Sequence, residues 1–264
     1  MKRYWGLSKG TIMESAAYRG HYLFTFVGNV FYIILVYFLW KSIYANTTQQ
    51  INGMTFKETF MYLTLAASIY SLMQTWADWD MSRSMLSGNV VLQFLKPTNY
   101  QAYKLFENFG VMVSNFVVLF IPSFILIVFV FNANINVGLN MAIFIISILL
   151  AYLINFGFDF IVGLLSFYTE SIWGISMTKE VIVLLFSGAV VPLPFFPEAM
   201  RKILELLPFQ AIYNIPLQIL TNKSYTVVDF LTQILIQLFW AAILIIGGSL
   251  FLKKASKIIT VNGG

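Results

Sequence analysis

Few residues in this chain are of types that do covalent or metal chemistry. There is no cysteine and only one histidine, His21. The lack of cysteine excludes disulfides, thiolate metal sites and a cysteine nucleophile. A lone histidine cannot supply a metal site, and the chain contains neither H-E-x-x-H nor the phosphate-binding pattern G-x-x-x-x-G-K-[ST]. Catalysis therefore has thin support, and the chain lacks the usual loop for holding ATP phosphates.

The most informative polar pair lies inside an apolar run. Asn155 and Asp159 are four positions apart, so on a helix they share a face, which Tyr152 and Gly163 extend. An acidic residue within a membrane span is costly and is by default a candidate functional site. The alternative is structural, with Asp159 hydrogen-bonded to a neighbouring helix or close enough to the membrane surface to be hydrated. A later charged group is expected in a solvated loop, with ion pairing to the lysine as the alternative: Glu170, Lys179 and Glu180.

A charged stretch, residues 78–107, separates two long apolar runs. One charge at mid-depth in hydrocarbon costs roughly 2.5–3.5 kcal/mol on insertion scales, so this stretch must lie outside the bilayer core. Its middle, residues 81–94, is predicted to form one short helix with a partly apolar face. Such a helix is placed to receive a push from a soluble partner, and the alternative is an ordinary interfacial loop helix. Pro97 ends that helix, because the residue before a proline disfavours the helical conformation. The charged members are Asp78, Asp80, Arg83, Lys96, Lys104 and Glu107.

Composition indicates the class of protein. Of 264 residues, 59% are hydrophobic and 10% are charged, with a mean hydropathy of +0.80, whereas soluble proteins are about 25% charged. Apolar runs near 20 residues favour helices over the roughly 10-residue strands of a barrel. We therefore expect an all-α polytopic membrane protein. The formal charge of +5 reflects membrane topology rather than nucleic-acid binding, because the basic residues are scattered among the spans.

The chain is expected to form a single membrane domain, residues 1–264, with six transmembrane helices. An interfacial helix at residues 1–20 precedes the first span, and no cleaved signal peptide is expected. Short polar loops are expected at 45–55 and 132–138, and a charged loop at 78–104. A kink is expected at Pro122. The continuous spans are predicted at residues 21–40, 56–77, 106–131, 139–167 and 230–252.

The fifth hydrophobic segment is broken. Residues 181–191 extend about 16 Å as a helix, at 1.5 Å per residue, which is roughly half the hydrocarbon core. Prolines at three nearby positions prevent a straight continuation, since each lacks a backbone donor: Pro192, Pro194 and Pro197.

Beyond the break we expect a re-entrant segment, residues 192–222. It would contain two short helices, 198–207 and 209–220, that dip back and cover the outer end of a pathway. Val190 and Phe195 would then help to form an external gate. The alternative is a single kinked span followed by an ordinary loop.

Basic residues predict the orientation, because they are concentrated on the cytoplasmic side. The N-terminal segment, the charged loop and the tail are the basic regions, and six crossings place all three on one side. Both termini and residues 78–104 should therefore be cytoplasmic. The basic residues that weaken this asymmetry lie in the opposite loops: Lys57, Arg201, Lys202 and Lys223.

Two segments carry a resemblance to a known family. They read SRSMLSGNVVLQFLKPTN, in the charged loop, and LFSGAVVPLPFFPEAMRKILELLPFQAIYNIP, across the broken segment. Together with the order of basic interfacial helix, six spans and basic tail, they resemble the permease subunit of a type-2 ATP-binding cassette (ABC) exporter. This group includes bacterial drug, bacteriocin and polysaccharide exporters. One departure is Gly88–Asn89, where the family commonly has Gly-Glu or Gly-Asp.

The resemblance implies partners and roles. Such permeases act in the cytoplasmic membrane as pairs, identical or homologous, above a cytoplasmic ABC ATPase dimer that binds ATP and Mg. This chain would bind no cofactor itself and would contact membrane lipid. The ATPase-coupling residues would be Arg83, Met85, Leu86, Gly88 and Leu92, and the pathway would include Asn155 and Asp159. The alternatives are an intramembrane enzyme or an ion-driven secondary transporter, and a neighbouring ATPase gene would favour the exporter.

Overall fold

The computed structural model describes residues 2–45, 50–131, 138–222 and 224–258. Within these ranges the chain is mostly helical, with one isolated bridge between Ile51 and Met54 and no strand. Four described helical stretches are long and apolar enough to cross a membrane: Arg19–Ala45, Tyr100–Phe129, Leu139–Leu165 and Val227–Ile258. The predicted all-α class is confirmed, with four of the six predicted spans found as candidate membrane helices among the described residues. Residues 46–49 of the predicted loop at 45–55, and residues 132–137 of the predicted loop at 132–138, lie outside the described residues.

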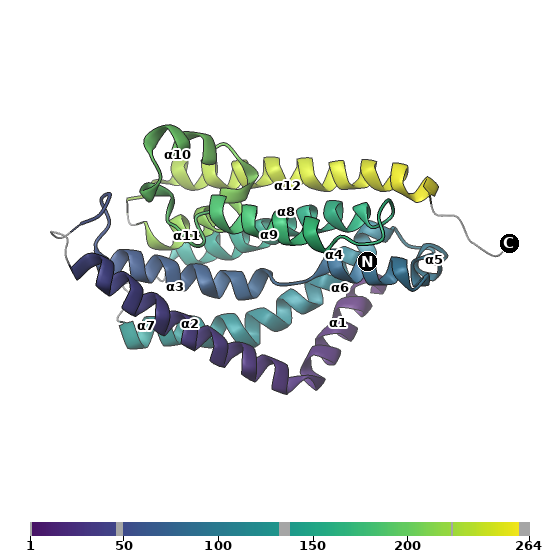
Figure 1. The fold of residues 1–264 in the computed structure, drawn as a ribbon, viewed down its shortest axis with the longest axis horizontal. Coiled ribbons are helices and arrows are strands. Elements are labelled where there is room, and N and C mark those ends of the chain that lie inside the picture. The colour runs from purple at the N-terminus through teal and green to yellow at the C-terminus, as the bar shows by residue number, and fades with distance from the viewer. Residues whose placement is uncertain (1, 46–49, 132–137, 223, 259–264) are drawn as a thin grey trace.

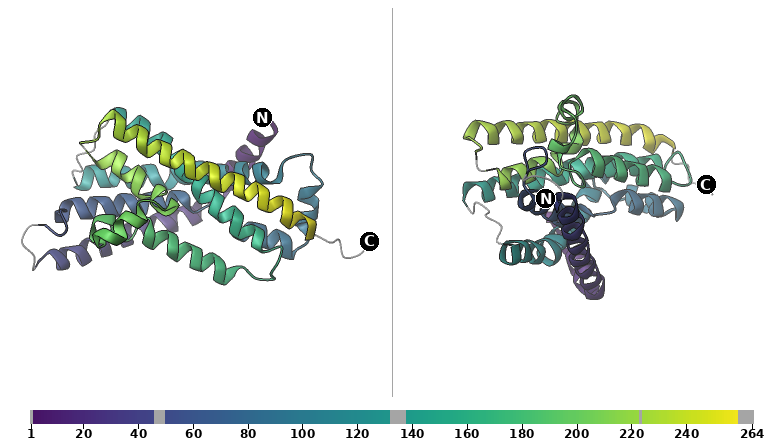
Figure 2. Two further views of the ribbon diagram at one scale, coloured as in Figure 1. Left: turned by 90° about the horizontal axis from the view of Figure 1, so that it is seen from above. Right: turned by 60° about the vertical axis from the view of Figure 1, so that its left-hand side comes forward.

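The centre of the molecule is built on α8 (Leu139–Leu165), which contributes many of the fully buried side chains. The helix α12 (Val227–Ala255) packs along it (Figures 1 and 2). At Gly157 a β-carbon would lie 2.6 Å from Cβ of Leu244, so the glycine permits this close approach. These helices correspond to the fourth and sixth predicted spans.

The first two helices form a V at one edge of the molecule (Figure 1). One arm, α1 (Lys2–Ala17), packs along α6 (Tyr100–Asn115), and the Ser8 hydroxyl donates to the Phe106 carbonyl at 2.5 Å. The other arm, α2 (Arg19–Ala45), is mostly exposed and contacts α3 (Phe56–Met73). Exposed apolar side chains on α2 suit a helix that faces lipid.

The third predicted span begins earlier than expected. It starts at Tyr100 rather than at residue 106, because Asn99 caps α6 and its side-chain oxygen accepts from the Ala102 amide at 2.9 Å. After α6 comes a π-helical turn, Phe116–Phe120, followed by α7 (Ile121–Phe131). The π-turn lies directly before Pro122, which has no backbone amide to donate. A proline and a π-turn are each a recognised cause of a helix kink.

The second predicted span ends earlier than expected. The helix α3 stops at Met73 rather than at residue 77. Trp76 then takes a left-handed conformation with φ 56° and ψ 32°. This conformation costs a non-glycine residue about 1–2 kcal/mol, and it redirects the chain into the next helix.

The fifth segment is broken, but its first helix is shifted from the predicted 181–191. The helix α9 runs Trp173–Phe186 and ends before Gly188, whose φ of +85° favours glycine. A 3-10 turn at Leu193–Phe195 follows, and then α10 (Glu198–Leu204). A further 3-10 turn at Pro208–Ala211 leads to the buried α11 (Asn214–Thr221). No continuous helix joins residues 181 and 205, as the prolines predict.

The two ends of the molecule differ in content. Figure 1 places α4 (Ala77–Leu86), α5 (Asn89–Phe94) and the C-terminal end of α12 together at one end. The short helices α10 and α11 lie toward the opposite end. The charged loop and the broken segment are therefore at opposite ends of the bundle.

Candidate functional site

The charged loop contains two helices rather than the single helix predicted for residues 81–94. The helix α4 ends at Leu86 and α5 begins at Asn89. Between them Gly88 has φ 72°, a conformation that glycine adopts without the steric cost of a β-carbon. The apolar periodicity continues across this break, which is why the pattern alone suggests one helix. Together α4 and α5 form a bent segment, here called the coupling segment.

One side of the coupling segment is anchored in the protein. Met81 and Val90 are fully buried, and the Phe94 ring stacks on Tyr100 with centroids 4.6 Å apart. A β-carbon at Gly163 of α8 would lie 2.7 Å from the Met81 sulfur, so α4 and α8 are in close contact there. This side therefore moves with the helical bundle.

The other side of the coupling segment is exposed. Leu86, Leu92 and Leu95 are 66%, 61% and 75% exposed. Arg83 and Gly88 are also exposed. Three large apolar side chains at the end of a helical bundle, close to a cation, are typical of a surface that binds another protein. Met85 is half buried and packs against the core, so it is less available than the other predicted coupling residues.

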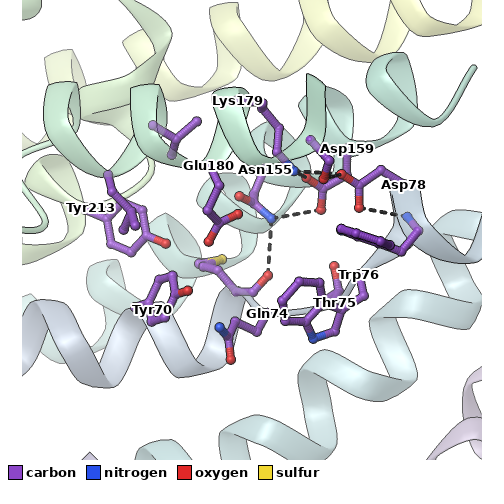
Figure 3. Close-up of a pocket in the computed structure, with 15 residues that line it drawn as sticks. Tyr70, Gln74, Thr75, Trp76, Asp78, Asn155, Asp159, Lys179, Glu180 and Tyr213 are labelled. Atoms are coloured by element: carbon purple, nitrogen blue, oxygen red, sulfur yellow. Dashed lines mark hydrogen bonds and ion pairs between the residues drawn. The ribbon is translucent and has the colours of Figure 1, made fainter. Parts of the chain in front are cut away.

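The first turn of α4 begins with a buried ionic group. Asp78 accepts from the Lys179 ammonium at 3.0 Å and from the Ser176 hydroxyl at 2.6 Å. Lys179 also contacts Asp159 of α8 at 2.6 Å. Figure 3 shows Lys179 of α9 between the carboxylates of Asp159 and Asp78. We call Asp78, Asp159 and Lys179 the buried triad, and it joins α4, α8 and α9.

A second buried lysine holds the same turn from another direction. Lys104 of α6 contacts Asp80 at 2.5 Å and Glu107 at 2.9 Å, and its side chain is 1% exposed. Residues two positions apart point to different sides of a helix. Asp78 and Asp80 can therefore bind lysines on α9 and α6 at once.

The buried triad is expensive to disrupt, whereas Asp80, which is 47% exposed, is partly screened by solvent. Buried charges are desolvated at a cost of several kcal/mol each, and removing one partner typically destabilises a protein by about 3–5 kcal/mol. The lysines on both sides of α4 thus favour one position of the coupling segment relative to α6, α8 and α9. A displacement of α4 must either move these helices with it or separate the charges.

A small polar cavity adjoins the buried triad. Its volume is about 20 Å³, enough for about one water molecule. Thr75 contributes a buried hydroxyl that has no partner within the described ranges. Asn155 donates to the Met73 carbonyl at 3.2 Å and to Asp159 at 3.3 Å, so it links the end of α3 to the triad. Glu180 also lines this cavity, on the side of Tyr70 (Figure 3).

A larger cavity of about 370 Å³ lies between α2, α3 and the end of α9. Its polar wall includes Asn29, whose amide donates to the Ser71 hydroxyl at 2.7 Å. Val190 is exposed and lines the same cavity. Tyr70 and Gln74 line both cavities. The two cavities are therefore neighbours, and only the larger one has the volume of a small-molecule site.

The other predicted gate residue lies apart from this cavity. Phe195 is half buried, and its ring centroid is 5.3 Å from that of Trp40 near the end of α2. The contact ties the 3-10 turn after the break to the first membrane helix. Phe195 is therefore placed to stabilise one position of the broken segment against α2.

A comparison with models of known families identifies the family of this chain. The model of the "ABC-2 family transporter protein" family matches residues 30–263, which is most of the chain. The chain belongs to the ABC-2 transporter family. No curated protein matches it. The resemblance to a type-2 ABC permease is thereby confirmed, and this ABC-2 transporter is a membrane transport component.

Sequence reasoning finds part of this ABC-2 transporter's site. It groups Asn155 with Asp159, and the structure shows them hydrogen-bonded. It expects Lys179 in a solvated loop, which is wrong, because Lys179 lies in α9 and is paired with two carboxylates. The sequence also does not predict that Lys104 pairs with Asp80. The one available signal is the pattern Asp-x-Asp directly after an apolar run.

Proposed function

We propose that this ABC-2 transporter is the permease subunit of an ABC exporter, driven by ATP hydrolysis on a separate polypeptide. The observation that carries the proposal is the two-sided coupling segment. Its outer side presents Leu86, Leu92 and Arg83. Its first turn forms ion pairs with α9 and α6, and the lysine of α9 also binds Asp159 of α8. Such an element can receive a displacement from a partner and pass it to the membrane helices.

The partner that fits the outer side is a cytoplasmic ABC ATPase dimer, with ATP and Mg bound there. Leu86 and Leu92 would be buried in the ATPase, and Arg83 would fix the register through a charge-assisted hydrogen bond. Gly88 would hold α4 and α5 at the angle that presents both leucines. A second permease chain, identical or homologous, would complete the transporter in a bacterial cytoplasmic membrane.

ATP-driven closure of the partner would push on α4. Because Asp78 binds Lys179, the push would reach α9, which leads to the broken segment. Because Asp80 binds Lys104, it would also reach α6. The two lysines would therefore distribute one displacement to helices on both sides of the coupling segment.

The proposed pathway uses the cavity of about 370 Å³ between α2, α3 and α9. In this proposal the chain crosses the membrane six times, with α3 and α9 among the crossings. Residues 192–222 form the re-entrant cover on the outside. Val190 and Phe195 act as the external gate, and Asn155 and Asp159 lie at the inner side of the pathway.

A single substitution on the outer side tests the proposal. Changing Leu86 to Glu places a charge where the ATPase would bury an apolar side chain, so ATPase association and transport should be lost. The matched control is Leu206→Glu, because Leu206 is also exposed but lies in the broken segment at the opposite end. The measurement is co-purification with the ATPase encoded by a neighbouring gene, together with ATPase activity in proteoliposomes.

Membrane insertion should be unchanged in both variants, since neither leucine is in a spanning helix. The proposal predicts that only Leu86→Glu prevents co-purification. Normal assembly and normal transport in that variant would contradict the assignment of Leu86 as an ATPase-coupling residue.

A further inference from the structure

A second large cavity lies at the apex of the V that α1 and α2 form. It has a volume of about 510 Å³ and lies between the α1–α2 corner on one side and α6, the π-turn and α7 on the other. Its far wall is apolar and is formed by Val113, Val117, Val118 and Pro122, with Ser114. We call this cavity the corner crevice.

Arg19 stands where the two arms of the V meet. Along α1 it continues a helical stripe that lines the crevice: Ile12, Ser15, Ala16 and Arg19. Along α2 it begins a second such stripe: Arg19, Tyr22, Leu23 and Phe26. Both stripes have the spacing of one helix face. The corner crevice is thus an apolar space with one cation at its apex.

The Arg19 guanidinium has more N–H donors than its one described hydrogen bond uses. Its Nε donates to the Ala16 carbonyl at 3.3 Å, and within the described ranges it forms no ion pair with a carboxylate. Guanidinium offers five donors in a planar fork that matches a phosphate. An exposed, unpaired arginine beside an apolar crevice complements a ligand with an anionic head and an apolar tail.

The position of α1 indicates which leaflet of the membrane the corner crevice faces. The Tyr4 hydroxyl accepts from the backbone amide of Asn99 at 3.2 Å, so the start of α1 lies beside the end of the coupling segment. The Ser8–Phe106 hydrogen bond then holds α1 along α6. The start of α1 is therefore on the coupling side, and we expect Arg19, just beyond the other end of α1, to lie at the headgroup level of that leaflet, with the α2 stripe extending into the hydrocarbon.

We propose that the corner crevice binds one phospholipid with a net anionic headgroup. Its acyl chain fills the space between α2 and the π-turn, where an unfilled gap would lose packing contacts. Its phosphate binds Arg19. The bound lipid braces α2 against α6, two helices that the wide V otherwise separates at this level. This inference does not depend on the identity of any cargo or on ATPase coupling.

Native mass spectrometry of the purified chain tests the proposal directly. Delipidated protein is exposed to phosphatidylglycerol or to phosphatidylcholine with the same acyl chains, and bound lipid is counted. We expect one phosphatidylglycerol to be retained at concentrations where phosphatidylcholine is not. Arg19→Gln should weaken that retention about tenfold, whereas Lys9→Gln, an exposed cation of α1 outside the crevice, should not.

A second variant tests the acyl-chain site and leaves the charge of Arg19 unchanged. Val117→Trp adds bulk on the far wall of the crevice, and Val228→Trp is the matched control on an exposed site of α12. Only Val117→Trp should reduce phosphatidylglycerol retention. Equal retention of both lipids, an unaltered Arg19→Gln variant, or a lipid-free oligomer in which a second copy covers the crevice would each overturn the proposal.

Discussion

The Lys179 ammonium lies 3.0 Å from the Asp78 carboxylate, although 101 positions separate the two residues in the chain. This contact joins the first turn of the coupling segment to the helix before the broken segment. Because Lys179 also binds Asp159, one cation compensates two buried carboxylates. Lys179 is therefore one of the two buried lysines that hold the first turn of α4.

Replacing Lys179 by Ala should destabilise the protein strongly. The substitution leaves Asp78 and Asp159 buried without their cation, a change that typically costs about 3–5 kcal/mol. The control is Lys202→Ala, which breaks the pair with Glu198, where the side chains are 69% and 70% exposed. An exposed pair of this kind contributes about 0–1 kcal/mol. Thermal unfolding in detergent should show a large fall in Tm only for Lys179→Ala, and equal falls would show that the triad is not a main stabilising element.

The close contact between α4 and α8 should be sensitive to a single added side chain. At Gly163 a β-carbon would meet the Met81 sulfur at 2.7 Å and the Asp78 Cα at 3.1 Å. Gly163→Val should therefore push α4 away from α8 and strain the triad. We expect ATPase association to survive, because the outer side of α4 is unchanged, while transport falls.

The control for that change is Gly174→Val, since nothing lies within 4 Å of a β-carbon there. Transport and ATPase co-purification are measured on both variants. Normal transport by Gly163→Val would show that the α4–α8 contact does not carry the displacement.

The sequence predicts local features of this fold well. Long apolar runs indicate the spans, and the prolines at 192, 194 and 197 indicate the break in the fifth segment. Both signals act through backbone geometry and hydrophobic burial within one stretch of chain. The shared face of Asn155 and Asp159 follows from helical spacing in the same way.

What the sequence does not predict depends on contacts between distant segments. Nothing in the pattern around Lys179 indicates that Asp78 will lie beside it, because that proximity requires α4 and α9 to pack on α8. The interruption at Gly88 is similar, since glycine is tolerated inside a helix and the pattern does not show that Met81 and Val90 are buried on either side of a left-handed residue. The early start of α6 at Tyr100 is a different case, because the Asn99 cap is a local signal that the prediction does not use.

The angle between α4 and α5 should require a residue that tolerates positive φ. Gly88→Val would place a β-branched residue at φ 72°, where strain is expected to be at least about 1–2 kcal/mol. The strain should be relieved by moving α5, which would separate Leu92 from Leu86 on the outer side. Gly88→Asn should be better tolerated, because asparagine visits this conformation. Affinity for the ATPase, measured by co-purification, should fall for the valine variant and be retained by the asparagine variant.

The opposite ends of the bundle should face opposite sides of the membrane. Because the chain has no cysteine, a single introduced cysteine is the only thiol that a maleimide can label. Glu198 and Lys254 are both exposed, and Figure 1 shows α10 and the end of α12 at opposite ends. From the basic residues near the termini and in the charged loop, we expect a membrane-impermeant maleimide added outside to label Glu198→Cys and not Lys254→Cys. Labelling of Lys254→Cys alone would reverse the topology.

The same labelling tests the predicted external gate. If Val190 belongs to that gate, Val190→Cys should be labelled faster during ATP turnover than at rest. Labelling of Val190→Cys at the same rate in both conditions would contradict the gate assignment.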